Sequence, residues 1–157
     1  MNSVEKKLEA LGLTLPPPRK WTTANRRGCT RVGSIVFVSG HGAHHPGMTY
    51  RQIGKLGSDM SVEEGVVTAR AAALTILATL KEEVGSLDRI KRVIRIFGMV
   101  NCTADFQDMS AVIDGASDLY LDLFGPENGC HARSAVGQAS LPRGQAVEIN
   151  GEFEIQM

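Results

Sequence analysis

The sequence predicts an α+β domain in which two helices cover one face of a mixed β-sheet. Apolar residues recur at helical spacing in two segments, residues 61–85 and 112–125. Strand-like segments surround these helices, in the order strand, strand, helix, strand, helix, strand, strand. The 157 residues are long enough to bury a core and are most simply one domain, 1–157.

Residues 1–18 are predicted to form a short helix and a proline-rich lead-in to the sheet. Residues 2–12 carry apolar side chains at helical spacing, and Gly12 favours an end to this helix. The three prolines at 16–18 cannot continue a helix and favour an extended chain.

The first apolar strand and the first long helix follow. A turn at 33–34 precedes a strand at 35–39, and the polar residues 41–60 are predicted to be a loop. Ser61 and Glu64 have the spacing of a capping box, which marks a helix start. The apolar stripe of this helix and its stop residue are Val66, Ala69, Ala73, Leu77, Leu80, Val84 and Gly85.

The second half repeats the strand and helix pattern. A strand is predicted at 92–101, and a second amphipathic helix is closed by the loop 125–129. The stripe of that helix is Val112, Ala116, Leu119, Tyr120, Leu123 and Phe124. Two final strands, 132–139 and 146–154, are predicted to pair antiparallel through the short connection 142–145.

The face of the sheet opposite the helices needs another cover. The side chains predicted to supply apolar surface there are Val36, Val38, Val136, Ile149 and Phe153. A sheet left half-naked is most simply buried against copies of itself. We therefore expect a homo-oligomer, with pockets where subunits meet.

Composition argues against several function classes. Lys plus Arg and Asp plus Glu number 17 each, so no basic excess is available for nucleic acid. The three cysteines are odd in number and lack CxxC spacing, which predicts a reducing compartment such as the cytoplasm. No apolar run approaches the roughly 20 residues that cross a bilayer, and no membrane partner is expected.

The segment HARSAVGQASLP, residues 131–142, contains the first candidate site residue. In an extended chain Arg133, Ala135, Gly137 and Ala139 point to one face. A guanidinium keeps its proton and its forked donors suit a carboxylate or phosphate, for which the small neighbours leave room. The alternative is a structural salt bridge to an acid of the same chain.

Glu148 is the acidic candidate. In the last strand Glu148 and Asn150 share one face, and antiparallel pairing could bring Glu148 near Arg133. Together the two side chains could bind a carboxylate substrate and orient or activate a water. They could equally pair only with each other.

The stretch SGHGAHH, residues 39–45, offers three histidines. Metal sites usually need three or four ligands on a rigid scaffold, and this loop has no acid at a fixed spacing. A solvated loop without metal is therefore expected, although His41, at a strand end, could border a pocket. Gly40 would let backbone donors approach a ligand, while Ser39 lacks the GxSxG setting of a nucleophile.

Several motifs in the right order resemble the RidA (YjgF) family, whose members also carry the name endoribonuclease L-PSP. They are VFVSG (36–40), SVEEG with AR and AAL (61–74), GSLDRIKRVIRIFGMVN (85–101), GASDLYLDLFG (115–125), and HARSAVGQASLP followed by VEINGEFE. The resemblance runs from about residue 10 to the end. LGLTLPPP and GASDL point to a subgroup distinct from the archetypal RidA proteins.

The resemblance implies a chorismate-mutase-like fold and a homotrimer with ligand sites in clefts between subunits. It also implies hydrolysis of reactive 2-imino acids or enamines to 2-oxo acids and ammonia, without a cofactor. In this pattern Arg133 would hold the substrate carboxylate and Glu148 would orient the water. Backbone groups around Ser39, Gly40 and Ala135 would line the cleft.

The sequence departs from the archetypal pattern at four positions. Arg26 falls where the archetype has a tyrosine, and Ala135 stands where a cysteine is usual. Ser117 aligns with an asparagine and His41 with a glutamine. A pocket with an extra cation at Arg26 would suit a larger or doubly anionic ligand.

Three functions follow as hypotheses. The first is an imine or enamine deaminase, or a close hydrolytic relative, and the second is a non-catalytic module that binds a small carboxylate metabolite. The third, an endoribonuclease or translation inhibitor, fits poorly with a neutral chain that has few aromatic residues.

Overall fold

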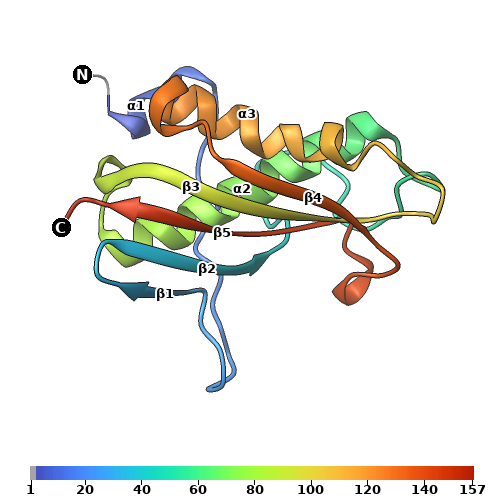
Figure 1. Cartoon of the computed structure of the whole chain (residues 1–157), viewed down its shortest axis with the longest axis horizontal. Helices are drawn as coiled ribbons and strands as arrows, with labels where there is room; N and C mark the ends of the chain where they lie inside the picture. Colours follow the sequence, from blue (N-terminus) through green and yellow to red (C-terminus); the bar gives the residue numbers. More distant parts are fainter. Residues whose placement is uncertain (1–2) are drawn as a thin grey trace.

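A five-stranded mixed sheet forms one layer of the protein, seen face-on in Figure 1. The structure is a computed structural model and describes residues 3–157. The strands are β1 (Cys29–Val32), β2 (Ile35–His41), β3 (Ile90–Asn101), β4 (Ala132–Gln138) and β5 (Val147–Ile155). Their order across the sheet is β1-β2-β5-β3-β4, and only β3 and β4 are parallel.

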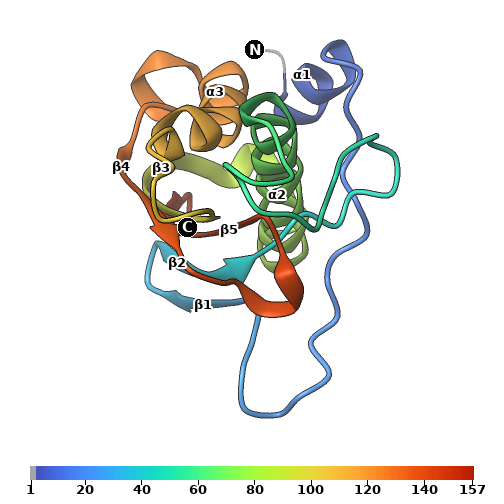
Figure 2. The ribbon, with the colours of Figure 1, turned by 90° about the vertical axis from the view of Figure 1, so that its right-hand side faces the viewer.

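The helices α2 (Val62–Val84) and α3 (Met109–Asn128) pack on the same side of the sheet (Figure 2). Helix α2 contacts β2 and β5, and α3 contacts β3 and β4. The short helix α1 (Val4–Ala10) packs against α3. The predicted α+β class with two helices on one face is confirmed. Asn2, where the first helix was predicted to begin, lies outside the described residues.

The long helix α2 begins at the predicted capping box. The Glu64 backbone N–H donates to Ser61 Oγ at 3.2 Å, and the Ser61 N–H donates to the Glu64 carboxylate at 2.8 Å. At the other end Gly85 adopts φ 85°, which a residue with a Cβ adopts only at a cost. The buried stripe of α2 includes Leu74, Leu77 and Leu80, all fully buried.

The end of α3 differs from the prediction. The residues 125–129, expected as a loop, continue the helix to Asn128 after a kink at Gly125, which has φ 79°. Pro126 cannot donate a backbone hydrogen bond, and the non-helical Gly125 before it lets the chain restart a helical turn. The helix therefore ends one turn later, close to the start of β4.

The predicted antiparallel pairing of the last two strands is wrong. Strand β3 lies between β4 and β5, and β4 is an edge strand parallel to β3. The connection contains a short 3₁₀ turn, Pro142–Gly144, which carries the chain past β3 to the centre of the sheet. Apolar alternation predicts that a strand exists, but it does not choose between possible neighbours.

The residues assigned to the uncovered face also need correction. Four of the five, Val36, Val38, Ile149 and Phe153, are buried on the helix side. The uncovered face is lined by the side chains that alternate with them, and cross-strand register defines its rows. These rows are Phe37–Glu152–Arg95, Asn150–Phe97–Ser134 and Glu148–Met99–Val136.

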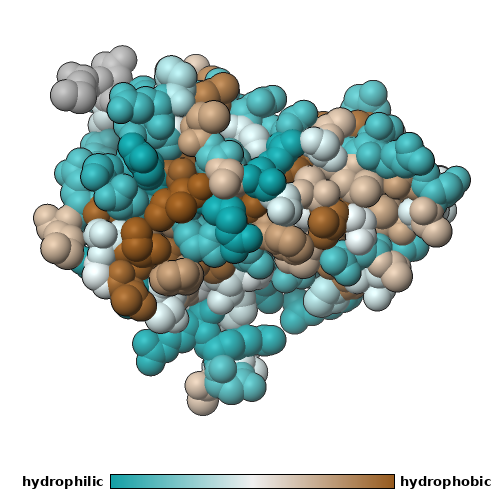
Figure 3. Space-filling model, in the orientation of Figure 1, coloured by the Kyte–Doolittle hydropathy of each residue, from teal (hydrophilic) through white to brown (hydrophobic). Residues whose placement is uncertain are grey.

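The uncovered face is partly apolar, as Figure 3 shows in the orientation of Figure 1. Phe37 is 46% exposed, and Phe97, Met99 and Val136 are half-buried within this single chain. The predicted apolar surface therefore exists, but of the five residues expected there only Val136 belongs to it. No helix within residues 3–157 is long and apolar enough to cross a membrane.

Candidate functional site

Arg133 projects from the edge strand β4 towards α3. Its Nη1 donates to Asp114 Oδ1 at 2.7 Å and to Ser117 Oγ at 3.0 Å, and its Nη2 donates to Ser110 Oγ at 2.6 Å. The three partners follow one polar stripe of α3, at spacings of four and three residues. The side chain of Arg133 is 20% exposed, whereas that of Asp114 is 53% exposed.

The salt-bridge alternative for Arg133 is thus realised within the chain, with Asp114 as the acid. Sequence reasoning missed Asp114, although its position between Ser110 and Ser117 on the polar side of an amphipathic helix was a usable signal. Ser117, a substrate-binding candidate from the sequence, accepts a hydrogen bond from Arg133 at 3.0 Å within the chain. Ala135 follows Arg133 on the same face of β4 and packs against the core.

A hollow of about 220 Å³ lies beside Arg133, between α3 and the start of β4. His131 Nδ1 lies 2.6 Å from the Gly129 carbonyl and therefore donates to it, which leaves Nε2 to accept from Ser117 Oγ at 3.1 Å. Burial, and secondarily the Arg133 charge, lowers the pKa of His131. Ser117 therefore donates to a neutral imidazole while it accepts from Arg133.

Glu148 projects from β5 onto the other, uncovered side of the sheet. Its carboxylate lies directly over Gly40 at the end of β2, where a Cβ would overlap Glu148 Oε1. Gly42 makes room for the Gln145 side chain in the same way. These two glycines are required because side chains of a neighbouring segment occupy the space of their missing Cβ atoms.

A cavity of about 120 Å³ contains Glu148. Its lining includes Arg19, Trp21, Arg26, Gly40, Gly42, Pro142, Arg143, Gln145 and Glu148. Arg26, singled out from the sequence, thus reaches the same cavity as Glu148. Arg19 and Arg143 were missed because they lie in irregular segments far apart in the chain, where no periodicity relates them.

His41 and Ser39 do not present their side chains to this cavity. His41 is fully buried, with Nδ1 donating to the Ser39 carbonyl at 2.6 Å and Nε2 accepting from Thr79 Oγ1 at 2.8 Å. Ser39 Oγ donates to the Arg27 carbonyl at 2.6 Å. Burial lowers the pKa of His41 to about 4, so the ring is neutral at physiological pH.

The expectation of a solvated histidine loop is also wrong. His45 is 3% exposed, and its backbone N–H donates to the Tyr50 hydroxyl at 2.7 Å. The His44 N–H donates to Thr75 Oγ1 on α2. The segment therefore packs onto α2, and in residues 3–157 no group of three His, Cys, Asp or Glu side chains is arranged to hold a metal.

Within one chain Arg133 and Glu148 lie on opposite faces of the sheet. Arg133 pairs across the sheet with Ile96, which is buried on the helix side. Glu148 pairs with Met99 on the uncovered side. The expected approach of Glu148 to Arg133 through adjacent strands is therefore wrong, since the pairing on which it depended does not form.

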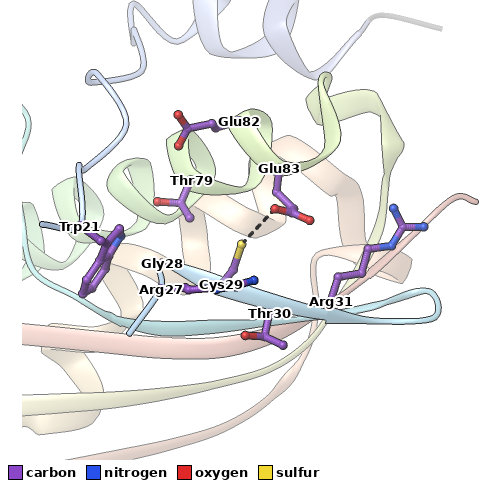
Figure 4. Close-up of a pocket in the computed structure, with 9 residues that line it drawn as sticks. All are labelled: Trp21, Arg27, Gly28, Cys29, Thr30, Arg31, Thr79, Glu82 and Glu83. Carbon is purple, nitrogen blue, oxygen red and sulfur yellow. Dashed lines mark hydrogen bonds between the residues drawn. The ribbon is translucent and has the colours of Figure 1, made fainter. Parts of the chain in front are cut away.

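Figure 4 shows a further pocket, of about 410 Å³, between β1 and α2. Cys29 Sγ lies 3.8 Å from a Glu83 carboxylate oxygen there. Burial, followed by the Glu83 charge, raises the pKa of the Cys29 thiol to about 11. The thiol is protonated at neutral pH and is a poor nucleophile.

Comparison with known proteins places this arrangement in a family. The sequence model of the family described as "YjgF/chorismate_mutase-like, putative endoribonuclease" matches residues 5–148. The Agrobacterium tumefaciens protein Atu1372 is 38% identical, with a TM-score of 0.88 over 98% of this chain and 92% of that one. A Shewanella oneidensis protein, also named as an endoribonuclease, is 34% identical, with a TM-score of 0.90 over 98% of this chain and 100% of that one.

A curated relative, Protein TCP17 of Trypanosoma cruzi, is 46% identical over 102 residues. This match covers 65% of the present chain and 64% of TCP17, so it spans less than two thirds of that relative. The family match covers most of the chain, includes α3 and β4, which position Arg133, and ends at Glu148, the second residue of β5. The chain belongs to the YjgF/chorismate mutase-like (RidA) family.

Proposed function

We propose that the protein hydrolyses reactive 2-imino acids, or the enamines in equilibrium with them, to 2-oxo acids and ammonia. The observation that carries this proposal is the geometry of Arg133. Two serines and Asp114 hold the guanidinium in place, yet its Nε–H takes part in none of these bonds. The remaining contact, from Nη2 to the Ser110 carbonyl at 3.4 Å, is long enough to be exchanged for a ligand.

A substrate carboxylate would accept from Nε and Nη2 of Arg133 in a bidentate pair. Such a pair fixes both the position and the plane of the bound carboxylate. The adjoining C2 atom, with its C=N bond, would then be held at a defined place beyond the edge of β4. Binding of this kind supplies orientation, which is a large part of the catalysis of a water addition.

Glu148 would accept a hydrogen bond from a water and direct its oxygen at C2. As the water oxygen bonds to C2, the C=N π electrons pass to nitrogen, and one proton is transferred from the water to that nitrogen, which gives a neutral carbinolamine. Collapse of this intermediate forms C=O, breaks the C–N bond and releases ammonia. The sum is imine plus water to 2-oxo acid plus ammonia, with no oxidant or cofactor needed.

The two residues would meet between subunits. Their opposite positions on the sheet prevent one chain from placing both at one substrate. The apolar rows of the uncovered face favour burial of Glu148 and its neighbours against another copy. We therefore propose a homotrimer in which Glu148 of one subunit faces Arg133 of the next across a cleft, as the family resemblance implies.

The test is the decay of 2-iminobutanoate and iminopyruvate, formed in situ by an amino-acid oxidase. Wild-type protein should accelerate 2-oxo acid formation, and Arg133→Ala should lower kcat/KM about 100-fold, because charge-assisted hydrogen bonds contribute about 1.5–3 kcal/mol. Arg89→Ala removes an arginine that lies outside the proposed cleft and should leave the rate unchanged. No acceleration by the wild type would reject the proposal.

Two other outcomes correspond to the other functions. Binding of 2-oxo acids without imine turnover would indicate a non-catalytic module for small carboxylates. Salt-dependent binding and cleavage of RNA would support the endoribonuclease name of the relatives. We place RNA last because the chain has no net charge and its cation-rich cavity, at about 120 Å³, is small.

A further inference from the structure

The cavity around Glu148 carries more positive charge than it balances. Arg19, Arg26 and Arg143 all line it, and Glu148 is its one acidic lining residue. None of the three arginines forms an ion pair with another residue in the range 3–157. The lining therefore has a formal surplus of two positive charges, from three arginines and one glutamate.

Two of these arginines lie over the aromatic ring of Trp21. The Arg19 guanidinium carbon lies 4.6 Å from the centroid of the Trp21 ring, and that of Arg26 lies 5.7 Å from it. Such cation–π contacts offset part of the repulsion between neighbouring guanidinium groups. Burial, followed by the charges of Arg143 and Arg26, lowers the pKa of Arg19, as expected for a guanidinium with two cations nearby.

Arg143 enters the cavity from an unusual backbone conformation. Its φ is 59°, and it is the one non-glycine residue with positive φ in the described part of the chain. Non-glycine residues adopt this conformation at a cost, and such residues cluster at functional sites. The turn between β4 and β5 thus holds a third cation beside the pair on Trp21.

The cavity lining also has a buried polar atom without a hydrogen-bond partner among the described residues. Gln145 is 6% exposed and lines the cavity, and its Oε1 has no hydrogen-bond partner among the described residues. A buried polar atom without a partner costs about 1–3 kcal/mol. A ligand or ordered water in the cavity would remove this cost.

We propose that Arg19, Arg26 and Arg143 bind a second carboxylate of the substrate, and that the preferred substrates are 2-imino dicarboxylates of four or five carbons. This assignment rests on the proposed imine hydrolysis and specifies its substrate class. The first carboxylate binds to Arg133 of the neighbouring subunit. The second enters the arginine cluster, which leaves the C=N group between them and beside Glu148.

The small volume of the cavity supports a short dicarboxylate. A space of about 120 Å³ admits a compact anionic group but excludes a nucleotide or a long acyl chain. The surplus of two positive charges exceeds the single negative charge of a carboxylate. It equals the double negative charge of a phosphoryl group. The experiment therefore separates these two anions.

Isothermal titration calorimetry would compare 2-oxoglutarate with 2-oxopentanoate, which has the same chain length and one carboxylate. We expect wild-type protein to bind the dicarboxylate at least tenfold more tightly, and 4-phosphono-2-oxobutanoate no more tightly than 2-oxoglutarate. Arg26→Gln and Arg143→Gln, which each remove one positive charge, should each reduce the preference for 2-oxoglutarate severalfold. Arg27→Gln is the matched control, since Arg27 follows in the same loop but lines the pocket between β1 and α2.

The outcomes separate failure of this inference from failure of the proposed function. Equal affinity for both 2-oxo acids, with imine turnover intact, would overturn the dicarboxylate assignment and leave the hydrolase standing. Absence of imine turnover would reject the proposed function itself. Much tighter binding of the phosphonate would overturn the carboxylate assignment in favour of a phosphoryl group. A loss of preference in Arg27→Gln equal to that in Arg26→Gln would exclude a local role for the cluster.

Discussion

The two arginine sites differ in how their positive charge is balanced. Arg133 lies 20% exposed against α3 and is neutralised by Asp114, with two serines completing its hydrogen bonds. Arg19, Arg26 and Arg143 share a cavity with a single acid, Glu148. The charge of Arg133 is balanced by an acid of its own chain, whereas the arginine cluster around Glu148 keeps a surplus of positive charge.

This difference gives the two regions different physical roles. A guanidinium held by its own chain is positioned accurately, and its remaining donor binds a ligand with little reorganisation. A cluster of unpaired guanidinium groups gives a positive potential that attracts anions. This attraction does not require an anion to bind in one exact position. We infer that Arg133 orients the reacting end of the substrate and that the cluster selects its other end.

The largest effect is expected from breaking the proposed contact between the two regions. Met99 lies between Glu148 and Val136 on the uncovered face. Met99→Asp would bury an unpaired charge in an interface, at a cost of several kcal/mol. Sedimentation should show a monomer, and imine hydrolysis should be lost because Arg133 and Glu148 no longer meet.

The matched control is Val67→Asp, which places the same charge on an exposed apolar position of α2, on the helix side. This variant should keep both its assembly and its activity. A monomeric Met99→Asp protein that retains full activity would show that one chain contains a complete site, which would remove the reason for separating the two regions.

A somewhat smaller effect is expected at the acid of the cation-rich cavity. Glu148→Gln keeps the shape of the side chain and removes the charge that orients the water. Because general acid–base groups contribute about 10²–10⁴-fold, we expect kcat to fall about 100-fold with little change in the affinity for 2-oxo acids that have one carboxylate and bind through Arg133. Glu82→Gln, an acid on α2 outside the cavity, should leave kcat unchanged. Wild-type kcat in Glu148→Gln would place the water elsewhere.

We expect the stability of the protein to depend on pH because of His41, which packs against Trp21 of the cavity lining. The guanidinium groups of Arg19 and Arg26 lie over the Trp21 ring. The same ring packs edge-on against the ring of buried His41, with 5.7 Å between the ring centroids. The pKa of His41 is lowered to about 4 in the folded chain, mainly by burial. Between pH 6.5 and 4 the unfolded chain therefore binds a proton that the folded chain does not, so stability falls as the pH falls.

Urea denaturation at pH 7 and pH 4.5 would measure this loss. The shift in pKa corresponds to a loss on the order of 2 kcal/mol in the free energy of unfolding. His41→Gln should show a smaller loss across the same range, although the lowered pKa values of His44 and His131 still contribute. An identical loss in both proteins would mean that His41 is not the group responsible.

The smallest effect is expected from removing the negative charge of Asp114, the ion-pair partner of Arg133. Asp114→Asn keeps a hydrogen-bond acceptor but removes the charge that competes with a substrate carboxylate. Because Asp114 is 53% exposed, solvent screens this charge, and calorimetry should show 2-oxo acids binding only about two- to threefold more tightly. Asp122→Asn, on the same helix but outside the hollow beside Arg133 and facing Arg70, should bind as the wild type does. Weaker binding in Asp114→Asn would show that Asp114 mainly positions Arg133.

The local structure of the elements could be predicted from the sequence. The capping box at Ser61 and Glu64, the stripe of α2 and the stop at Gly85 all occur as predicted. Each depends on groups within a few residues of one another, so the pattern contains the necessary information. Arg133 and Ser117 were both singled out as site candidates, Ser117 through the family resemblance, but their contact with each other was not predicted.

The pairing of strands and the choice of exposed face could not be predicted in the same way. The short connection at 142–145 suggested adjacent strands, yet β3 lies between them. Strand order depends on which long-range contacts bury the most apolar surface, and local alternation has the same appearance for either neighbour. The same ambiguity led Val36 and Phe153 to be assigned to the wrong face.

The sequence by itself determined that this chain forms an α+β domain of the YjgF family, with Arg133 and Glu148 as the candidate site residues. Only the tertiary structure decided that these two lie on opposite faces, that Asp114 neutralises Arg133, and that Arg19 and Arg143 join Arg26 around Glu148. The physical reason is distance along the chain. Asp114 and Arg133 are 19 residues apart, and Arg19 and Arg26 lie more than a hundred residues from Arg143 and Glu148. At either separation the charges interact through space, and no local pattern records which of them the fold brings together.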